Sequence, residues 1–228
     1  MTSMTRIRHW AVAVAVAGIG VVSAGCLVKD SSSTLILEPG GAVRWVVTER
    51  NIHAVADTPA DRLREEEDYM GLAATGTHPV ATAFLALGGQ EIRTAASSDW
   101  PFTVVTDARF PDVARLWQDY FDRMHVPATS RIERSGTRTT WTLVVTIGGD
   151  EPDASDEDGL GALIEGDDRP TFVIRHGEFV EAVGFAISDD GRVAKMDDLE
   201  KRDWEKDPQL VLKLSWVGTE AASSRSPR

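Results

Sequence analysis

The chain has 228 residues and a formal net charge of −12, with 42% hydrophobic and 26% charged residues. This composition is typical of a globular protein of one or two domains and excludes disordered, collagen-like and repeat-array chains. The negative charge disfavours binding to nucleic-acid phosphates and to anionic lipid headgroups. The chain contains one cysteine, which excludes an internal disulfide framework and any multi-cysteine metal site.

The first residues have the pattern of an export signal. Arg6 and Arg8 form a short basic region, and an uninterrupted apolar run follows from Trp10 to Val22. As a helix this run would be about 20 Å long, which is short against a bilayer core of about 30 Å. A basic start, an apolar middle and small residues at the end are typical of a secretory signal peptide. We therefore expect residues 1–25 to be a signal peptide. The alternative is an uncleaved N-terminal anchor helix.

The segment ends in Ser23-Ala24-Gly25-Cys26. This sequence resembles the lipobox of bacterial lipoproteins, in which small residues precede a cysteine, although Ser23 stands where that family usually has leucine. The resemblance covers residues 1–26 only. It implies that the Cys26 thiol receives a diacylglyceryl group and that the signal is cut before Cys26. It also implies that the new amino group is acylated, for example with palmitate. Cys26 is thus the predicted lipid-attachment residue.

The residues after Cys26 bear on how the protein would be anchored. One acyl chain binds a membrane marginally, whereas two or more give stable anchoring. Lys29 is the only basic residue nearby, so anchoring would depend on the acyl chains. Leu27 and Val28 differ from the aspartate that retains some lipoproteins in the inner membrane. We expect a lipidated polar tether over residues 26–33, and a protein that faces the periplasm or the exterior from the outer rather than the inner membrane.

The next part of the chain predicts a hairpin, two helices and a strand. Val43, Trp45 and Val47 alternate with other residues after a Pro-Gly-Gly turn, which indicates a half-buried strand. Thr58 before Pro59 is typical of a helix N-terminus. The expected elements are strands 34–38 and 42–51, a charged helix from Pro59 towards Ala74, a short helix starting at 77–79 and ended by Gly88-Gly89, and a strand over 102–106.

The clearest predicted helix covers residues 110–124. Pro111 and Asp112 open it, and apolar residues then recur at helical spacing along one face. These residues are Val113, Leu116, Trp117, Tyr120, Phe121 and Met124. We expect this helix to be the main helix of the core, and its aromatic residues to serve packing rather than cofactor binding.

The remaining sequence predicts more strands. The expected elements are a hairpin of strands 130–134 and 137–147, an acidic glycine-rich loop over 148–169, strands 171–175, 179–188 and 192–196, a charged stretch over 197–206, a strand over 209–217, and a disordered tail over 218–228. Residues 34–217 are therefore expected to form a single α+β domain. It would contain a mainly antiparallel sheet built from hairpins, with the 110–124 helix packed on it.

The sequence contains none of the common catalytic motifs that we considered. The sequence lacks the Gly-x-Ser-x-Gly elbow of hydrolases, the His-Glu-x-x-His zinc motif and the phosphate-binding Gly-x-x-x-x-Gly-Lys loop. The histidines are scattered. His176 and Glu178 offer a possible general-base pair, because a carboxylate can orient an imidazole, but an ordinary turn that contains a histidine is the commoner explanation. We expect no enzymatic activity, no cofactor and no catalytic residue.

Two further patterns have alternative interpretations. Asp156, Asp158, Gly159 and Glu165 have the spacing of a calcium-binding loop, although Ala154 stands at the first ligand position. A solvated acidic loop is the simpler interpretation, so we predict no metal site.

Tryptophan supplies the second pattern, with seven in the chain against two tyrosines. Trp100 and Trp204 lie outside the core patterns, and an exposed tryptophan can mark a surface that contacts sugar or lipid.

These observations give a leading hypothesis and two alternatives. The leading hypothesis is a lipid-anchored envelope protein whose non-catalytic domain binds a partner protein or an apolar ligand. The alternatives are an anchored envelope hydrolase with a dispersed active site, and a structural spacer. A deep pocket with convergent titratable groups would favour the hydrolase, whereas an exposed apolar patch would favour binding.

Overall fold

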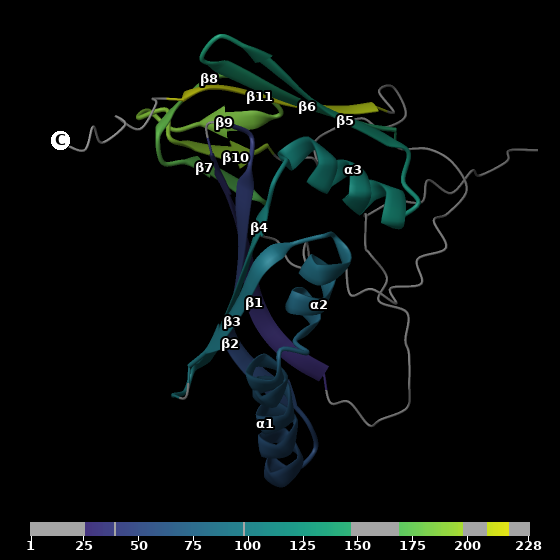
Figure 1. Ribbon diagram of the computed structural model, residues 1–228. Coiled ribbons are helices and arrows are strands. Elements are labelled where there is room, and N and C mark those ends of the chain that lie inside the picture. Colours follow the sequence, from purple (N-terminus) through teal and green to yellow (C-terminus); the bar gives the residue numbers. More distant parts are fainter. Residues whose placement is uncertain (1–25, 39, 98, 147–168, 198–208, 219–228) are drawn as a thin grey trace, which may run out of the picture.

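The computed structural model describes residues 26–38, 40–97, 99–146, 169–197 and 209–218 (Figure 1). The larger sheet of this part has the strand order β3 (Gln90–Ala96), β4 (Phe102–Phe110), β2 (Val43–Val55), β1 (Cys26–Leu37), β7 (Thr171–Ile174), β10 (Val193–Met196), β9 (Phe185–Ile187). The smaller sheet has the order β5 (Ala128–Ser135), β6 (Arg138–Thr146), β11 (Gln209–Gly218), β8 (Gly177–Val183). The described helices are α1 (Pro59–Thr75), α2 (Pro79–Ala86) and α3 (Val113–Arg123).

Strand β1 belongs to the larger sheet from its first residue. It pairs antiparallel with β2, starting with Cys26 opposite Val55 and continuing to the far end of both strands. The expectation of a polar tether over residues 26–33 is therefore wrong. Ser33 of this segment is buried, and its Oγ accepts a 2.5 Å hydrogen bond from Trp45 Nε1.

The α+β class is confirmed, but the arrangement of strands differs from the one expected. The hairpins form two sheets rather than one, and the larger sheet is mixed. Strand β1 pairs in parallel with β7, with Thr34 opposite Thr171. A parallel pair cannot be joined by a tight hairpin, so a pattern of successive hairpins does not predict this contact.

Aromatic side chains link the two sheets and α3 into one core. The ring centroid of Trp117 on α3 lies 5.4 Å from that of Trp45 on β2 and 6.2 Å from that of Trp141 on β6. The Trp141 ring in turn lies 5.4 Å from Phe172 on β7. Because these residues belong to one buried cluster, helix α3 has the core position that its periodicity predicts.

Helix α3 is shorter than the range 110–124. Phe110 is the last residue of β4 and is buried, so the helix begins only at Val113. Asp112 caps it: one carboxylate oxygen accepts hydrogen bonds from the backbone N–H groups of Ala114 at 2.8 Å and Arg115 at 3.1 Å. These bonds satisfy donors that have no partner within the first helical turn.

Other sequence expectations are met in part. Strand β3 was not expected, and the predicted strand over 179–188 is divided at Gly184, whose φ of +76° separates β8 from β9. The acidic loop with its calcium-like pattern, the charged stretch after 197 and the C-terminal tail lie outside the described residues, apart from their first or last positions.

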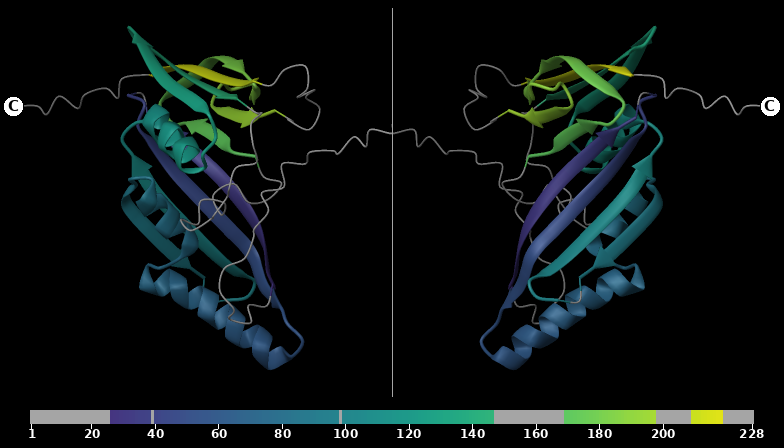
Figure 2. Two further views of the ribbon diagram at one scale, coloured as in Figure 1. Left: turned by 90° about the vertical axis from the view of Figure 1, so that its right-hand side faces the viewer. Right: turned by 90° about the vertical axis from the view of Figure 1, so that its left-hand side faces the viewer.

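Helices α1 and α2 pack near the lower half of the larger sheet (Figure 2). Helix α1 contributes Tyr69 and Ala73 to a second, smaller core with Ile52 of β2 and Val104 of β4. None of the helices that the structure describes is long and apolar enough to cross a membrane.

Candidate functional site at the Cys26 end

The predicted lipid-attachment residue lies at one end of the larger sheet. Cys26 is the first residue of β1 and stands opposite Val55, the last residue of β2. Helix α1 begins soon afterwards at Pro59. The β3–β4 connection reaches the same end, because Ile52 near the end of β2 pairs with Phe102 at the start of β4. We call this region the Cys26 end. It comprises residues 26–28, 52–55, 59–63, 97 and 99–102.

A buried charged cluster lies beside this end. It consists of Lys29 on β1, Glu49 on β2, Tyr69 on α1 and His78, the residue before α2. Glu49 Oε1 lies 2.7 Å from Lys29 Nζ and accepts a 3.0 Å hydrogen bond from the Tyr69 hydroxyl. The other carboxylate oxygen lies 3.1 Å from His78 Nε2, a close contact that is poorly aligned for a hydrogen bond. Lys29 Nζ also donates to the Tyr69 hydroxyl at 3.2 Å.

The electrostatics of this cluster favour its charged form. Burial alone raises the pKa of Glu49, but the contact with His78 and the positive charge of Lys29 outweigh burial and lower it below the ordinary value. Burial likewise opposes the charge on Lys29, but Glu49 and Tyr69 raise the pKa of its ammonium group. Burial, followed by the charge of Glu49, raises the pKa of Tyr69. Lys29 and Glu49 therefore form an ion pair in the folded protein, with Tyr69 as a neutral donor.

The sequence contains one signal for this cluster that the motif search missed. Val43, Trp45 and Val47 point to the core because they alternate along β2, and Glu49 has the next position of the same parity. A carboxylate at an inward position of a strand needs partners, since an unpaired buried charge is strongly unfavourable. The identity of those partners depends on tertiary contacts between β1, α1 and the start of α2, which the pattern does not reveal.

The arrangement of the cluster suits a structural role better than a catalytic one. Glu49 is 1% exposed and His78 is fully buried. Two shallow hollows of about 450 Å³ and 410 Å³ on the described part are lined by other residues. The first lies over β5, β6 and β11, and the second lies between α1, α2 and β3. Both are therefore separate from the residues with the most strongly shifted pKa values.

The other histidines do not join this cluster. His53, His125 and His176 are exposed, and Glu178 is exposed as well. His78 was one of the scattered histidines of the sequence, and among the histidines that the structure describes it is the buried one. No group of three or more potential metal-ligating side chains occurs within the described ranges.

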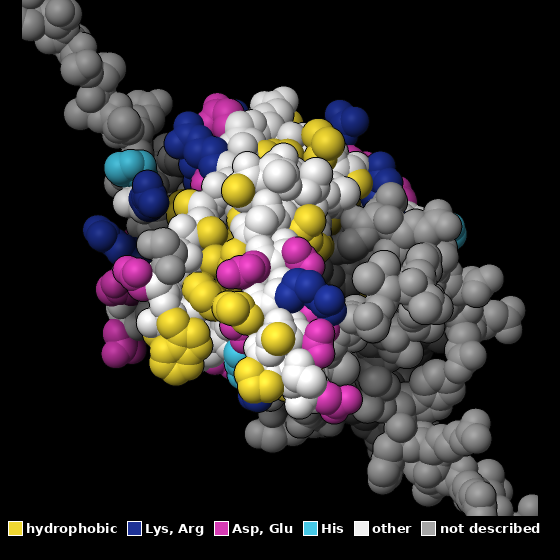
Figure 3. All heavy atoms as spheres, turned by 90° about the horizontal axis from the view of Figure 1, so that it is seen from below, with side chains coloured by type: hydrophobic (Ala, Val, Ile, Leu, Met, Phe, Trp, Pro, Cys, Tyr) yellow, Lys and Arg dark blue, Asp and Glu magenta, His cyan; other side chains and the backbone are white. Residues whose placement is uncertain are grey.

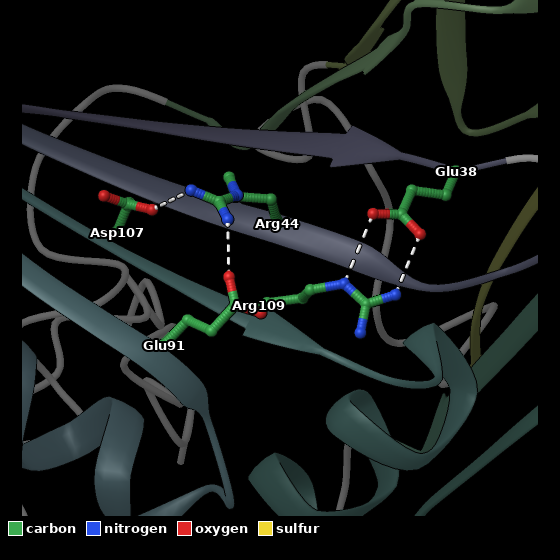
Figure 4. A network of polar contacts seen from close by, with 5 residues as sticks. All are labelled: Glu38, Arg44, Glu91, Asp107 and Arg109. Carbon is green, nitrogen blue, oxygen red and sulfur yellow. Dashed lines mark hydrogen bonds and ion pairs between the residues drawn. The ribbon is translucent and has the colours of Figure 1, made fainter.

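A second group of charged residues lies between neighbouring strands of the larger sheet (Figure 4). Arg44 donates to Asp107 at 2.6 Å and to Glu91 at 3.1 Å, and Arg109 donates to both carboxylate oxygens of Glu38, at 3.4 Å and 3.0 Å. These pairs are partly exposed, and such pairs contribute about 0–1 kcal/mol each. Because both guanidinium groups already bind carboxylates, this group serves cross-strand pairing and not anion recognition.

The Cys26 end also carries exposed apolar side chains. They are Val28, Val55, Leu63 and Trp100, with exposed fractions of 45%, 58%, 54% and 75%. Figure 3 looks at the molecule from this end and shows apolar side chains gathered among acidic and basic ones. The expectation that Trp100 is exposed is therefore confirmed.

Comparison with known proteins leaves the family of this chain open. No protein-family model matches the chain, and no curated protein matches it. Among solved structures, the folded domain of LppM from Mycobacterium tuberculosis is 10% identical, with a TM-score of 0.38, over 90% of this chain and 98% of that chain. The Fcho1 mu homology domain of Danio rerio with a bound Eps15 peptide is 11% identical, with a TM-score of 0.21, over 85% of this chain and 78% of that chain. These scores are too low to support an argument about shared fold or function.

Proposed function

We propose that this protein is a bacterial envelope lipoprotein, anchored by acyl chains on Cys26, whose α+β domain acts by binding rather than by catalysis. The observation that carries the proposal is the place of Cys26 in both sequence and fold. It is the single cysteine of the chain, it follows an apolar leader, and it is the first residue of β1.

The fold is compatible with cleavage before Cys26. Cys26 is itself paired in the sheet, opposite Val55, and cleavage before it would leave this pairing in place. Acyl chains would then emerge at one end of the larger sheet, away from the aromatic core that joins the two sheets.

Two observations support a non-catalytic domain. Glu49 and Tyr69, whose pKa values are shifted, are buried, and neither lines one of the two shallow hollows. The two shallow hollows are lined mainly by exposed side chains of other residues. In an enzyme, the ionisable side chains with shifted pKa values are expected to line a concave site. The exposed apolar side chains of the Cys26 end favour binding instead.

Intact mass spectrometry of the full-length protein, expressed in a bacterium that processes lipoproteins and extracted from its membranes, tests the anchor. We expect a chain that begins at Cys26 and carries at least a diacylglyceryl group. The variant Cys26→Ser should retain residues 1–25 and gain no lipid. As a matched control, Ser23→Leu restores the leucine usual in the lipobox and should be processed at least as completely as the natural sequence. An unmodified thiol in the natural protein would overturn the proposal.

A second experiment tests the absence of catalysis. The acylated protein is incubated with purified envelope polymers, and the products are followed by chromatography. We expect no hydrolysis. Hydrolysis that is lost in Glu49→Gln, while the variant keeps its folded near-ultraviolet spectrum, would show that the buried cluster is catalytic and would contradict a binding domain.

A further inference from the structure

We propose that the Cys26 end lies directly against the bilayer, with the Trp100 side chain inserted at the interface between headgroups and hydrocarbon. This inference rests on the proposed function, because it needs an acyl anchor at Cys26. It goes further by assigning a lipid-contacting surface and an orientation to the folded domain.

The first argument is the absence of a spacer between the anchor and the fold. Cys26 is paired with Val55 in the sheet, and the pairing continues with Leu27 opposite Ala54. An extended chain advances at most about 3.5 Å per residue, and here no residue separates the attachment point from the first strand. Acyl chains on Cys26 would therefore bring the neighbouring surface to the membrane.

The second argument is the nature of that surface. The exposed apolar residues of this end come from separate elements: Val28 from β1, Val55 from β2, Leu63 from α1 and Trp100 from the β3–β4 connection. A hydrogen bond from the Ala54 N–H to Glu66 Oε1, 3.0 Å long, holds α1 against the end of β2. Single exposed apolar residues are ordinary on a protein surface, but several at one end indicate a contact surface.

The third argument concerns Trp100 itself. It is 75% exposed, whereas the other tryptophans of the described part, Trp45, Trp117, Trp141 and Trp216, are all buried. Tryptophan is enriched where an apolar body meets a polar boundary, and it concentrates at the membrane–water interface. Its position on a connection at the Cys26 end places the ring where an anchored domain would meet lipid.

The charges of this end favour lipids without net charge. Arg62 and Asp99 are exposed, and Asp61 forms a partly exposed ion pair, with a 3.3 Å contact, to Arg64 just beyond this end. The two signs are mixed, so no basic patch attracts anionic headgroups. Contact with the bilayer would therefore depend on apolar burial, and added anionic lipid should not strengthen it.

Depth-dependent fluorescence quenching tests the inference. The acylated protein, with a chain that begins at Cys26, is reconstituted into phosphatidylcholine vesicles that contain a fraction of phosphatidylcholine brominated near the headgroup end of its chains. We expect clear quenching of tryptophan emission, and loss of most of this quenching in Trp100→Phe. The buried tryptophans should contribute little, and Trp204→Phe should keep the quenching. Replacing part of the phosphatidylcholine with phosphatidylglycerol should not increase it.

A matched pair of strand variants tests the surface around Trp100. Val55 and Val183 are exposed to 58% and 45% and lie on β2 at the Cys26 end and on β8 in the smaller sheet. We expect Val55→Asp to reduce quenching of Trp100 and Val183→Asp to leave it unchanged. Equal effects of the two variants, or quenching that requires anionic lipid, would overturn the inference.

The outcomes separate this inference from the proposed function. Intact mass on the same samples reports whether Cys26 is acylated. If the protein is acylated but Trp100 is not quenched, the anchor stands and the bilayer contact is wrong. Trp100 would then be available to a partner protein instead. If Cys26 carries no lipid, the proposed function itself fails.

Discussion

Replacing Lys29 by methionine tests the buried charged cluster, because methionine keeps much of the side-chain volume and removes the charge. The surviving carboxylate of Glu49 is 1% exposed, whereas the side chain of Lys29 is 17% exposed. Removal of one partner from a buried ion pair costs about 3–5 kcal/mol. Tyr69 and His78 remain near Glu49, so we expect a loss of about 3 kcal/mol in the free energy of unfolding.

The reverse substitution, Glu49→Gln, should cost less. It leaves Lys29 without its carboxylate partner, but the ammonium group is close enough to the surface for water to reach it. We expect a loss of about 1–2 kcal/mol, and a double variant that costs less than the sum of the two single variants because the pair is coupled.

Urea unfolding of the detergent-solubilised protein, followed by tryptophan fluorescence, measures these losses, provided that the denaturant slope stays constant. Lys213→Met is the matched control, because its partner Glu181 is 40% exposed, and it should cost at most about 1 kcal/mol. If Glu49→Gln destabilises the protein as much as Lys29→Met, unequal burial of the two partners does not control the energetics and the reasoning is wrong.

Three further predictions concern stability. Because the pKa of Glu49 is lowered in the folded state, its carboxylate stabilises the fold above the ordinary carboxyl pKa, and this stabilisation is lost as pH falls through the lowered value. In unfolding titrations from about pH 7 to about pH 3, the free energy of unfolding should therefore decrease less in Glu49→Gln than in the natural protein. Ser33→Ala should cost about 1–3 kcal/mol in thermal or urea unfolding, because it leaves the buried Trp45 N–H without its acceptor; an unchanged midpoint would mean that the bond is unimportant. Gly177→Ala places a Cβ in steric overlap with the backbone oxygen of Val217 on β11 at a φ of +134°, whereas Gly136→Ala meets no atom within 4 Å at a φ of +60°. Gly177→Ala should abolish folding or lower the free energy of unfolding by more than about 3 kcal/mol, and Gly136→Ala should lower it by about 1 kcal/mol in the same assays. Equal losses would contradict the steric overlap at Gly177.

Much of the fold follows from local patterns. The alternation of Val43, Trp45 and Val47 predicts β2, and the spacing of apolar residues predicts α3, because each element buries one continuous face. The helix start at Thr58-Pro59 is also confirmed: the Thr58 hydroxyl accepts a 3.2 Å hydrogen bond from the Asp61 N–H. Such features depend on residues close in sequence, so the sequence alone predicts them.

The errors come from contacts between distant residues. The polar segment 26–33 suggests a solvated tether, yet Ser33 and Lys29 have buried partners on β2 and α1 that no local pattern reveals. The parallel pairing of β1 with β7 has the same origin, because it brings together segments far apart in sequence. For the candidate site, the alternation along β2 predicts that Glu49 faces the core. Its contact with His78 could not be predicted, because it depends on how α2 begins.

The pairing of β1 with β2 begins at Cys26 and, apart from one register shift between Val28 and Asp30, extends to Leu37. An acyl anchor at Cys26 would therefore also set the orientation of the domain. A twelve-residue strand spans about 40 Å at the usual rise per residue. The far turn of the β1–β2 hairpin contacts the smaller sheet, since Arg134 of β5 donates a 2.7 Å hydrogen bond to the carbonyl oxygen of Gly40. An acylated Cys26 would thus hold the long axis of the hairpin away from the membrane, because no flexible linker separates the attachment residue from the sheet. The hollow over β5, β6 and β11 would be presented tens of ångströms above the lipid, at a height fixed by the length of a single hairpin.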